Sequence, residues 1–207
     1  MLKKGYMRII LGFFCFVLSL QVSLHSQNID ARLFKAINKH HSPGWDRFYE
    51  FQSRSVKPVY IATPLSFVAT GLLRKDTYMR DAGILMTTSA VANLAITYSM
   101  KAAINRERPY KALNNVHTVG STERSASFPS GHTSSAFNIA TSLSLAYPKW
   151  YVIVPSYAWA GVVGYSRIKM GMHYPGDVLA GALIGAGTSY LTFKLQKPIL
   201  NTIHKLF

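Results

Sequence analysis

Apolar residues gather in five stretches of 15 to 19 residues that follow the first quarter of the chain. Small and branched side chains dominate these stretches, and few helix breakers interrupt them. Signals for strands, such as a strict alternation of apolar and polar residues, are weak throughout. The pattern predicts an all-α protein, a helical bundle with five core apolar helices in the stretches 58–73, 82–100, 133–147, 150–165 and 178–193.

The first 26 residues have the order of a secretory signal. Two lysines and an arginine precede a continuous apolar run, and small or polar residues follow this run around Ser26. An uncleaved N-terminal anchor helix would have the same order of residues. We therefore expect a signal peptide or anchor over residues 1–26 and a single domain over residues 27–207.

Two short helices are expected between this leader and the first apolar stretch. Apolar residues recur at helical spacing from Ile29 to Ile37. The residues Ser42, Pro43 and Gly44 then predict a turn, because proline and glycine punctuate regular structure. A second short helix is expected after this turn.

The apolar stretches fit a membrane bundle, although a soluble alternative remains. They are slightly short of the ~20 residues that span a bilayer, they are rich in Ser, Thr and Gly, and the mean hydropathy is only +0.12. Against this, they contain almost no charge, and alternate connectors carry Arg74, Lys75, Arg80 and Lys149. Basic connectors favour the cytoplasmic side, but the outer connectors are basic as well, so the charges only support this orientation. We predict a membrane-embedded bundle, with a soluble periplasmic protein as the alternative.

The charge balance is strongly basic, with 23 Lys and Arg against 8 Asp and Glu and a net charge of +15. Such a value often indicates a nucleic-acid-binding protein. Here the basic residues are spread along the chain, without a basic helix or a zinc-binding pattern, so no nucleic acid is expected. An anionic substrate and a membrane fit better. The single cysteine, Cys15, excludes a disulfide framework.

Three motifs fall on the same side of the predicted topology, which is the outer side. In the first, "KAAINRERP", Lys101 and Arg108 are two helical turns apart, so they share a helix face if the helix runs on to Pro109. In the second, "FPSGHTSS", the residues Ser130, Gly131 and His132 open a helix. Backbone N–H groups at such a start, with glycine allowing close approach, form an anion site.

The third motif lies in "YSRIKMGMHYPGDVLAG", residues 165–181. Pro175 suits the first position of a helix, which places Asp177 in its first turn and His173 just before it. The carboxylate could then accept a hydrogen bond from the ring of His173 and fix its tautomer. Arg167 adds a third cation to Lys101 and Arg108.

Together the motifs supply three cations, two helix N-termini, two histidines and a carboxylate. Cations and helix dipoles stabilise a phosphate dianion and the charge that develops on it. A histidine oriented by a carboxylate can act as a nucleophile, and a second histidine can act as acid and base. No cluster of ligands has metal-binding spacing, so the sequence predicts phosphoryl transfer without a metal or other cofactor.

The order K-x6-RP, PSGH and SR-x5-H-x3-D resembles the signature of the type 2 phosphatidic acid phosphatase superfamily. The resemblance extends from about Leu33 to Phe193, and "HYPGDVLAG" is more similar to membrane lipid phosphatases than to secreted acid phosphatases. It implies a helical bundle, a phosphohistidine intermediate and no metal. The residues that carry it are Lys101, Arg108, Pro109, Pro129, Ser130, Gly131, His132, Ser166, Arg167, His173 and Asp177.

The resemblance also implies a role for each residue of the predicted site. His173 resembles the nucleophile, Asp177 its orienting partner, and His132 the general acid that later activates water. The phosphate-binding residues would be Lys101, Arg108, Ser130, Gly131 and Arg167. The pattern gives no role to Arg106 or Glu107, and the polar segment 110–128 reads as a solvated loop that could also cap the pocket.

The leading interpretation is a phosphatase that acts on a lipid phosphate or diphosphate at the outer face of a bacterial inner membrane. The resemblance suggests undecaprenyl diphosphate, phosphatidylglycerol phosphate, phosphatidic acid or the phosphates of lipid A as substrates. A soluble periplasmic acid phosphatase of broad specificity is the alternative. A non-catalytic membrane protein that binds phosphate is the third reading, which the complete set of His132, His173 and Asp177 disfavours.

Overall fold

The computed structural model describes residues 24–204. Most of the predicted leader therefore lies outside the described residues, and the predicted boundary near Ser26 falls inside the first described helix. In chain order the helices are α2 (Leu24–Ile37), α3 (Pro43–Arg74), α4 (Thr77–Ile104), α5 (Pro109–Ala112), α6 (Gly131–Ala146), α7 (Trp150–Lys169), α8 (Pro175–Lys194) and α9 (Gln196–Ile203). Over the described range the fold is all-α, as predicted.

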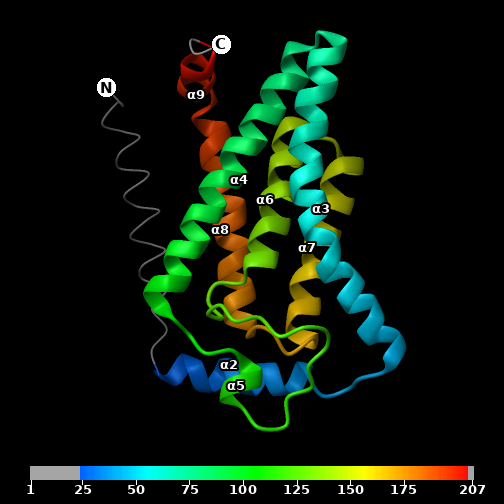
Figure 1. The fold of residues 1–207 in the computed structure, drawn as a ribbon, viewed down its shortest axis with the longest axis vertical. Coiled ribbons are helices and arrows are strands. Elements are labelled where there is room, and N and C mark those ends of the chain that lie inside the picture. Colours follow the sequence, from blue (N-terminus) through cyan, green and yellow to red (C-terminus); the bar gives the residue numbers. More distant parts are fainter. Residues whose placement is uncertain (1–23, 205–207) are drawn as a thin grey trace.

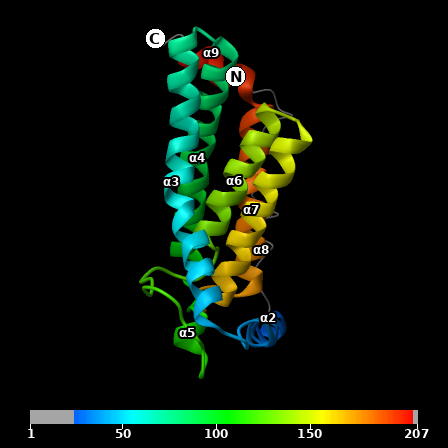
Figure 2. The same ribbon diagram turned by 90° about the vertical axis from the view of Figure 1, so that its right-hand side faces the viewer.

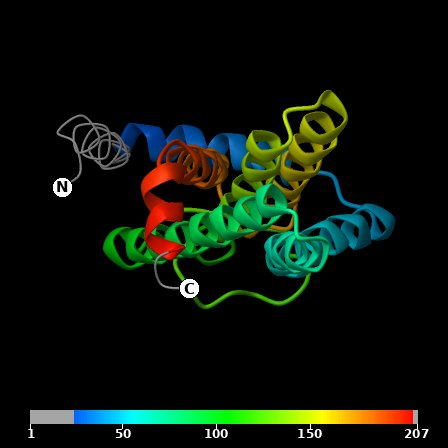
Figure 3. The ribbon, with the colours of Figure 1, turned by 90° about the horizontal axis from the view of Figure 1, so that it is seen from above.

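The five predicted apolar helices are confirmed as α3, α4, α6, α7 and α8, which run side by side as a bundle (Figure 1). The helix α6 packs against each of the other four, so it forms the centre of the bundle, as the view from above also shows (Figure 3). The amphipathic helix α2 crosses one end of the bundle (Figure 2). We call this the α2 end; the short helix α5 and the connection 113–130 lie there too.

The first long helix differs from the prediction, because the expected second short helix and the first apolar stretch form one element. α3 begins at Pro43, where proline occupies the first helical position, and continues for 32 residues through Pro58 and Pro64. Proline in a helix interior removes one backbone hydrogen bond. Membrane helices tolerate this loss, because neighbouring helices and local adjustments satisfy the freed carbonyl.

The helix α3 is long and apolar enough to span a membrane. The helices α8 and α9 together are also long and apolar enough, although they are bent by 68° where they join. Large apolar side chains also cover the outside of the bundle. The exposed ones include Phe51, Ile61, Leu65 and Leu72 of α3, Val91, Leu94 and Tyr98 of α4, Trp150, Tyr151 and Val154 of α7, and Leu179, Leu183 and Tyr190 of α8. An apolar surface of this extent suits contact with lipid.

Polar side chains fill the interior of the bundle and bond to one another. Asn138 donates a hydrogen bond to Ser89 at 2.7 Å, and Ser134 donates one to Asn93 at 2.6 Å. All four residues are fully buried. Hydrogen bonds between polar side chains are a common means of holding membrane helices together. The polar content that lowers the mean hydropathy therefore lies inside the bundle and does not argue for a soluble protein.

Small residues allow α8 to approach the central helix α6 closely. A Cβ atom built on Gly185 would lie 2.1 Å from the backbone oxygen of Ser134, and one on Gly181 would lie 2.6 Å from the oxygen of Ser130. Any larger residue would push the two helices apart. This contact also fixes the start of α6 against the start of α8, where two of the three motifs lie.

We expect Gly185→Ala to destabilise the protein by about 1–3 kcal/mol, because the added methyl group overpacks the contact between α6 and α8. Gly161→Ala is the matched control, since a Cβ atom on this helical glycine meets nothing within 4 Å. Thermal unfolding in detergent measures both variants. Equal melting temperatures for the two would contradict the close contact.

Candidate active site

The structure brings all the predicted site residues together at the α2 end of the bundle, where the ends of five helices meet. Each residue sits at or next to the end of a helix. The expectation that Lys101 and Arg108 share one helix face is wrong, because α4 ends at Ile104, before Arg108. Lys101 lies in the last turn of α4, Arg108 precedes α5, Ser130, Gly131 and His132 open α6, Arg167 lies in the last turn of α7, His173 lies in the turn after it, and Asp177 lies in the first turn of α8.

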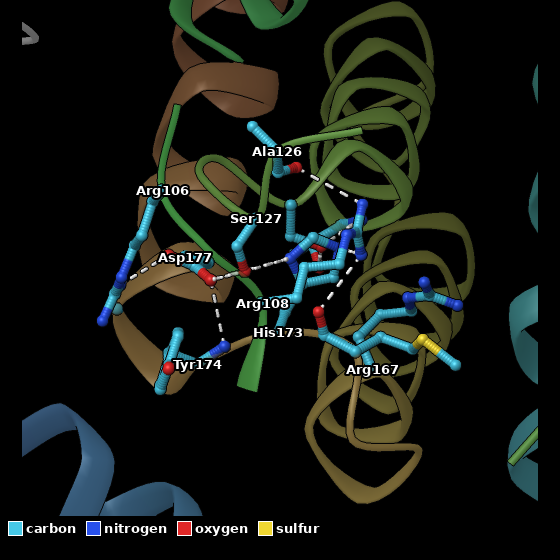
Figure 4. Close-up of polar contacts among 12 residues, drawn as sticks. Arg106, Arg108, Ala126, Ser127, Arg167, His173, Tyr174 and Asp177 are labelled. Atoms are coloured by element: carbon cyan, nitrogen blue, oxygen red, sulfur yellow. Dashed lines mark hydrogen bonds and ion pairs between the residues drawn. The ribbon is translucent and has the colours of Figure 1, made fainter. Parts of the chain in front are cut away.

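The predicted pair of His173 and Asp177 is joined through a third residue (Figure 4). The Nδ1 atom of His173 lies 3.7 Å from Oδ2 of Asp177, which is too long for a direct hydrogen bond. Ser127 lies between them: its hydroxyl donates to Asp177 at 2.5 Å and lies 3.5 Å from Nδ1. On the other side, Nη1 of Arg108 lies 3.2 Å from Nε2 of His173. Because Arg108 can only donate, Nε2 carries the lone pair.

Arg106, to which the sequence pattern gave no role, holds Asp177 from the other side (Figure 4). It contacts Oδ1 of Asp177 at 2.6 Å and Oδ2 of Asp30 in α2 at 2.8 Å. Its guanidinium also lies 3.9 Å from the centre of the Tyr174 ring. Asp30 in turn accepts a hydrogen bond from the backbone N–H of Gly176 at 2.8 Å. Arg106 thus links α2, the site and the start of α8.

A carboxylate lies between two of the predicted phosphate-binding cations. Glu123, in the connection 113–130, pairs with Nη2 of Arg108 at 2.7 Å and with Nη2 of Arg167. Its Oε1 atom is 3.7 Å from Nδ1 of His132. Arg108 and Arg167 are almost fully buried, and Glu123 is 31% exposed. We refer to Lys101, Arg108 and Arg167 as the clamp.

The remaining predicted residues have different surroundings. The ammonium group of Lys101 donates to the backbone oxygen of Ala126 at 2.5 Å. The hydroxyl of Ser130 is buried and bonds to that of Thr133 at 2.8 Å, so it caps α6. Gly131 and His132 line the cavity described next. A direct contact between Ser130 and phosphate therefore stays a prediction.

A cavity of about 620 Å³ adjoins the clamp and reaches α3 and α4. Its lining is mixed. Charged and polar side chains come from the clamp, from α6 and from the first half of α3, and apolar ones come from α3 and α4. The lining includes Lys101, His132, Arg167 and Glu123 on the polar side, and Tyr60, Ile61, Leu94 and Tyr98 on the apolar side. A ligand with an anionic head and an apolar tail matches this lining.

The charges around the two loop residues of the site change their pKa values. Burial lowers the pKa of His173 well below its ordinary value, and the nearby charges of Arg108 and Arg167 lower it further. The ring is therefore neutral at pH 7, as a nucleophile must be. Burial alone would raise the pKa of Glu123, but Arg167 and Arg108 outweigh it and lower the pKa to about 2. Glu123 is ionised at every physiological pH.

Over residues 24–204, the side chains that could jointly hold a metal ion are His41, Asp46 and His117, whose ligand atoms lie within 4.8 Å of one another. None of the three belongs to the clamp or to the histidine pair of the site. His117 is held by Asp46 at 3.0 Å, so the cluster also anchors the connection 113–130 to the start of α3.

The family model of the PAP2 superfamily matches residues 82–199, which include all three motifs. The chain belongs to the PAP2 superfamily. Similar proteins include the undecaprenyl-diphosphatase of Sulfolobus acidocaldarius, 30% identical over 94% of this chain and 93% of the relative. The lipid A 4'-phosphatase of Bacteroides thetaiotaomicron is 29% identical over 80% of this chain and 76% of the relative.

A solved structure shows the same fold. The crystal structure of a transmembrane PAP2 type phosphatidylglycerolphosphate phosphatase from Bacillus subtilis matches with a TM-score of 0.71 and 24% identity, over 96% of each chain. Membership of the PAP2 superfamily confirms the predicted resemblance, and with it a phosphatase.

Sequence reasoning missed three residues of this PAP2 site, namely Arg106, Glu123 and Ser127. Two weak signals were present. Arg106 stands two positions before the motif residue Arg108, and Glu123 is the only acidic residue between positions 110 and 128. Ser127 had no signal, because a serine in a polar loop is common. Their contacts reach across 15 to 71 residues, which a local pattern cannot show.

We expect Arg106→Gln to lower kcat by about tenfold with little change in KM, because Arg106 positions Asp177 and does not touch the clamp. Tenfold is the lower end of the effect of groups that orient a catalytic side chain. Arg106→Lys should restore part of the loss by returning the charge. Steady-state kinetics measure kcat and KM separately. Arg32→Gln, on the exposed side of α2, is the control and should change neither. A rise in KM at unchanged kcat would contradict a positioning role.

Proposed function

We propose that this PAP2 chain hydrolyses a terminal phosphate or diphosphate on a lipid, without a metal ion, through a phosphohistidine intermediate. His173 is the nucleophile, His132 is the general acid and base, and Asp177 orients His173. Lys101, Arg108, Arg167 and the start of α6 at Ser130 and Gly131 bind the phosphate. The soluble acid phosphatase and the non-catalytic binding protein gain no support from any observation.

The single observation that carries this proposal is the anion site formed by Arg108, Arg167 and His132. A carboxylate, that of Glu123, already lies there. The Nε atom of Arg167 is buried and has no partner among the described residues, so the clamp can bind further oxygen atoms. A phosphate has more oxygen atoms and more charge than a carboxylate, so it can accept more hydrogen bonds from the cations and balance more of their charge.

In the first step, Nε2 of His173 attacks phosphorus, and the bond from phosphorus to the leaving oxygen breaks. The clamp stabilises the charge on the equatorial oxygens. His132 gives its proton to the leaving oxygen, and the lipid departs with that proton. The proton on Nδ1 of His173 faces Ser127 and Asp177, whose charge stabilises the cationic phosphohistidine.

In the second step, His132 accepts a proton from water, and the oxygen of this water attacks the phosphohistidine. The bond between phosphorus and Nε2 breaks, which returns neutral His173 and releases phosphate. Arg106, Ser127 and the N–H of Tyr174 all donate to the carboxylate of Asp177 and hold it in place through both steps. A carboxylate that holds its histidine in this way need not take the proton.

The substrate class follows from the cavity and from the orientation of the bundle. Apolar residues of α3 and α4 line the cavity next to the clamp, which suits a head group whose chain remains in the bilayer. The opposite end of the bundle carries Arg74, Lys75, Arg80 and Lys149 (Figure 1). The α2 end is also basic, so the positive-inside rule does not orient the bundle. The proposal takes the outer, periplasmic position of the site from the predicted order of the leader and the five apolar helices. Undecaprenyl diphosphate, phosphatidylglycerol phosphate, phosphatidic acid and lipid A are the candidates.

We expect His173→Ala to abolish turnover, and His132→Ala to lower it by about 10²-fold or more, which is the usual scale of acid–base catalysis. Phosphate release in EDTA measures both, since the mechanism uses no metal. Rapid acid-free quenching should also trap labelled phosphoenzyme in wild-type protein and none in His173→Ala. His40→Ala, which removes an exposed imidazole, is the control. Near-wild-type turnover in the His173 variant would contradict the role of His173 as the nucleophile.

We expect the protein to leave membranes only with detergent, and to hydrolyse a lipid phosphate faster than p-nitrophenyl phosphate. The reason is the apolar lining of the cavity and the apolar outer surface of α3, α4, α7 and α8. Fractionation at high salt and a panel of purified lipid phosphates measure these two properties. Active protein in the high-salt supernatant would contradict a membrane enzyme and would favour a soluble periplasmic phosphatase.

A further inference from the structure

Glu123 lies where the proposed mechanism needs the substrate phosphate. Its two carboxylate oxygens pair with different clamp arginines, Oε2 with Arg108 and Oε1 with Arg167, and Oε1 also faces His132. This is the bridging arrangement that a phosphate would adopt between two guanidinium groups. The substrate phosphate and the Glu123 carboxylate therefore cannot occupy the clamp together.

The backbone beside Glu123 uses the remaining donors of the clamp. Arg108 donates to the oxygen of Ser125 at 2.8 Å, and Lys101 donates to the oxygen of Ala126 at 2.5 Å. Behind these contacts the nucleophile His173 is fully buried. A phosphorus atom can reach Nε2 of His173 only after the segment around Glu123 has moved.

Two anchors confine this movement to the residues between them. The backbone of His117 bonds to both ends of the Asn38 side chain, at 3.1 and 3.2 Å. The N–H of Ser127 bonds to the oxygen of Arg106 at 2.7 Å, and its hydroxyl bonds to Asp177. Residues 118–126, which carry Glu123, lie between these fixed points.

Within the segment 118–126 the N–H of Val119 bonds to the oxygen of Met170 at 3.3 Å, and the hydroxyl of Tyr110 donates to the backbone oxygen of Glu123 at 2.5 Å. The movement that frees the clamp is therefore that of the Glu123 side chain and of residues 124–126. Glu123 also lines the cavity, so its carboxylate can leave the clamp toward open space.

From this geometry we propose that Glu123 is an internal competitor that lowers the anion affinity of the site, so that abundant phosphodiester head groups do not fill the clamp while a terminal phosphate still can. The proposal rests on the proposed function, because it takes the clamp as the phosphate site. A carboxylate attached to the chain acts as a tethered ligand, and every external anion must displace it. The apparent affinity of each anion then falls by the same factor, the fraction of molecules with a free clamp.

The same factor has different consequences for the two kinds of lipid. A terminal phosphate carries about −1.5 to −2 charges at pH 7 and three free oxygens, so it binds three cations strongly and still displaces Glu123. A phosphodiester carries one negative charge and two free oxygens, like the carboxylate itself. Bilayers contain phosphodiester lipids in large excess, and a clamp without Glu123 would be filled by them. With Glu123 in place, the dissociation constant of a phosphodiester lipid exceeds its concentration in the bilayer, so these lipids leave the clamp unoccupied.

The test compares wild-type protein with Glu123→Gln, which keeps the shape of the side chain and removes its charge. Calorimetry measures the binding of inorganic phosphate and of short-chain phosphatidylglycerol in detergent. We expect both dissociation constants to fall by the same factor, about tenfold or more, as the loss of two charge-assisted hydrogen bonds suggests. Glu107→Gln removes an equal charge from an exposed site beside Arg108 and should change neither constant.

Hydrolysis in vesicles is the second measurement. Adding phosphatidylglycerol to vesicles that contain a lipid phosphate should leave wild-type hydrolysis unchanged and should inhibit Glu123→Gln competitively. If both proteins bind phosphate equally, or if phosphatidylglycerol inhibits neither protein, Glu123 is not an internal competitor. The proposed function stands in either case. If neither protein binds phosphate, the clamp is not a phosphate site, and the proposed function fails together with this inference.

A wild-type experiment keeps the proposal testable if Glu123→Gln does not fold. Arg124 is exposed and lies beside Glu123 in the segment that must move. Saturating phosphate should speed tryptic cleavage after Arg124 and leave cleavage after Arg54, in α3, unchanged. Phosphate binding that leaves both cleavage rates unchanged would mean that the anion does not displace Glu123, and this would overturn the proposal.

Discussion

The burial of three cations at one end of a helical bundle is the constraint on which the rest of this structure depends. Lys101, Arg108 and Arg167 are each at most 8% exposed. Charges removed from water are costly unless paired and hydrogen-bonded. Carbonyl oxygens of the connection 113–130 and the carboxylate of Glu123 supply this compensation. The connection is therefore ordered by the cations, and the three cations are held together before any substrate arrives.

The same constraint explains why the interior of the bundle is polar and its surface apolar. The catalytic end needs helices whose termini meet closely, and Gly181 and Gly185 permit this between α6 and α8. Buried Asn and Ser side chains then hold the helices through hydrogen bonds. In lipid, apolar burial does not drive helices together, so packing and polar contacts must. The fold and the site thus use the same close contacts.

The sequence predicted the five apolar helices and the residues that meet at the site, because both follow from local signals. Hydrophobic runs define the helices, and Lys101, Arg108, His132, His173 and Asp177 lie in short motifs at helix ends. The continuation of α3 back to Pro43 was missed, because proline and glycine at positions 43 and 44 suggested only a turn. Ser127 and Glu123 were missed for another reason. Their positions depend on partners 44 to 50 residues away, in a segment without periodicity.

The negative charges of the two carboxylates in the site are balanced in different ways. The partners of Asp177 are fixed, whereas the partners of Glu123 can exchange it for another anion. Asp177 is fully buried, and side chains from two other segments and its own turn donate to it, so nothing in solution can replace its partners. Glu123 is partly exposed, lies on a connection anchored at both ends, and pairs with the cations that a phosphate would bind. A bundle that holds buried cations ready for a dianion needs a counter-charge in its resting state. A counter-charge on a side chain that a phosphate can displace provides it without closing the site permanently.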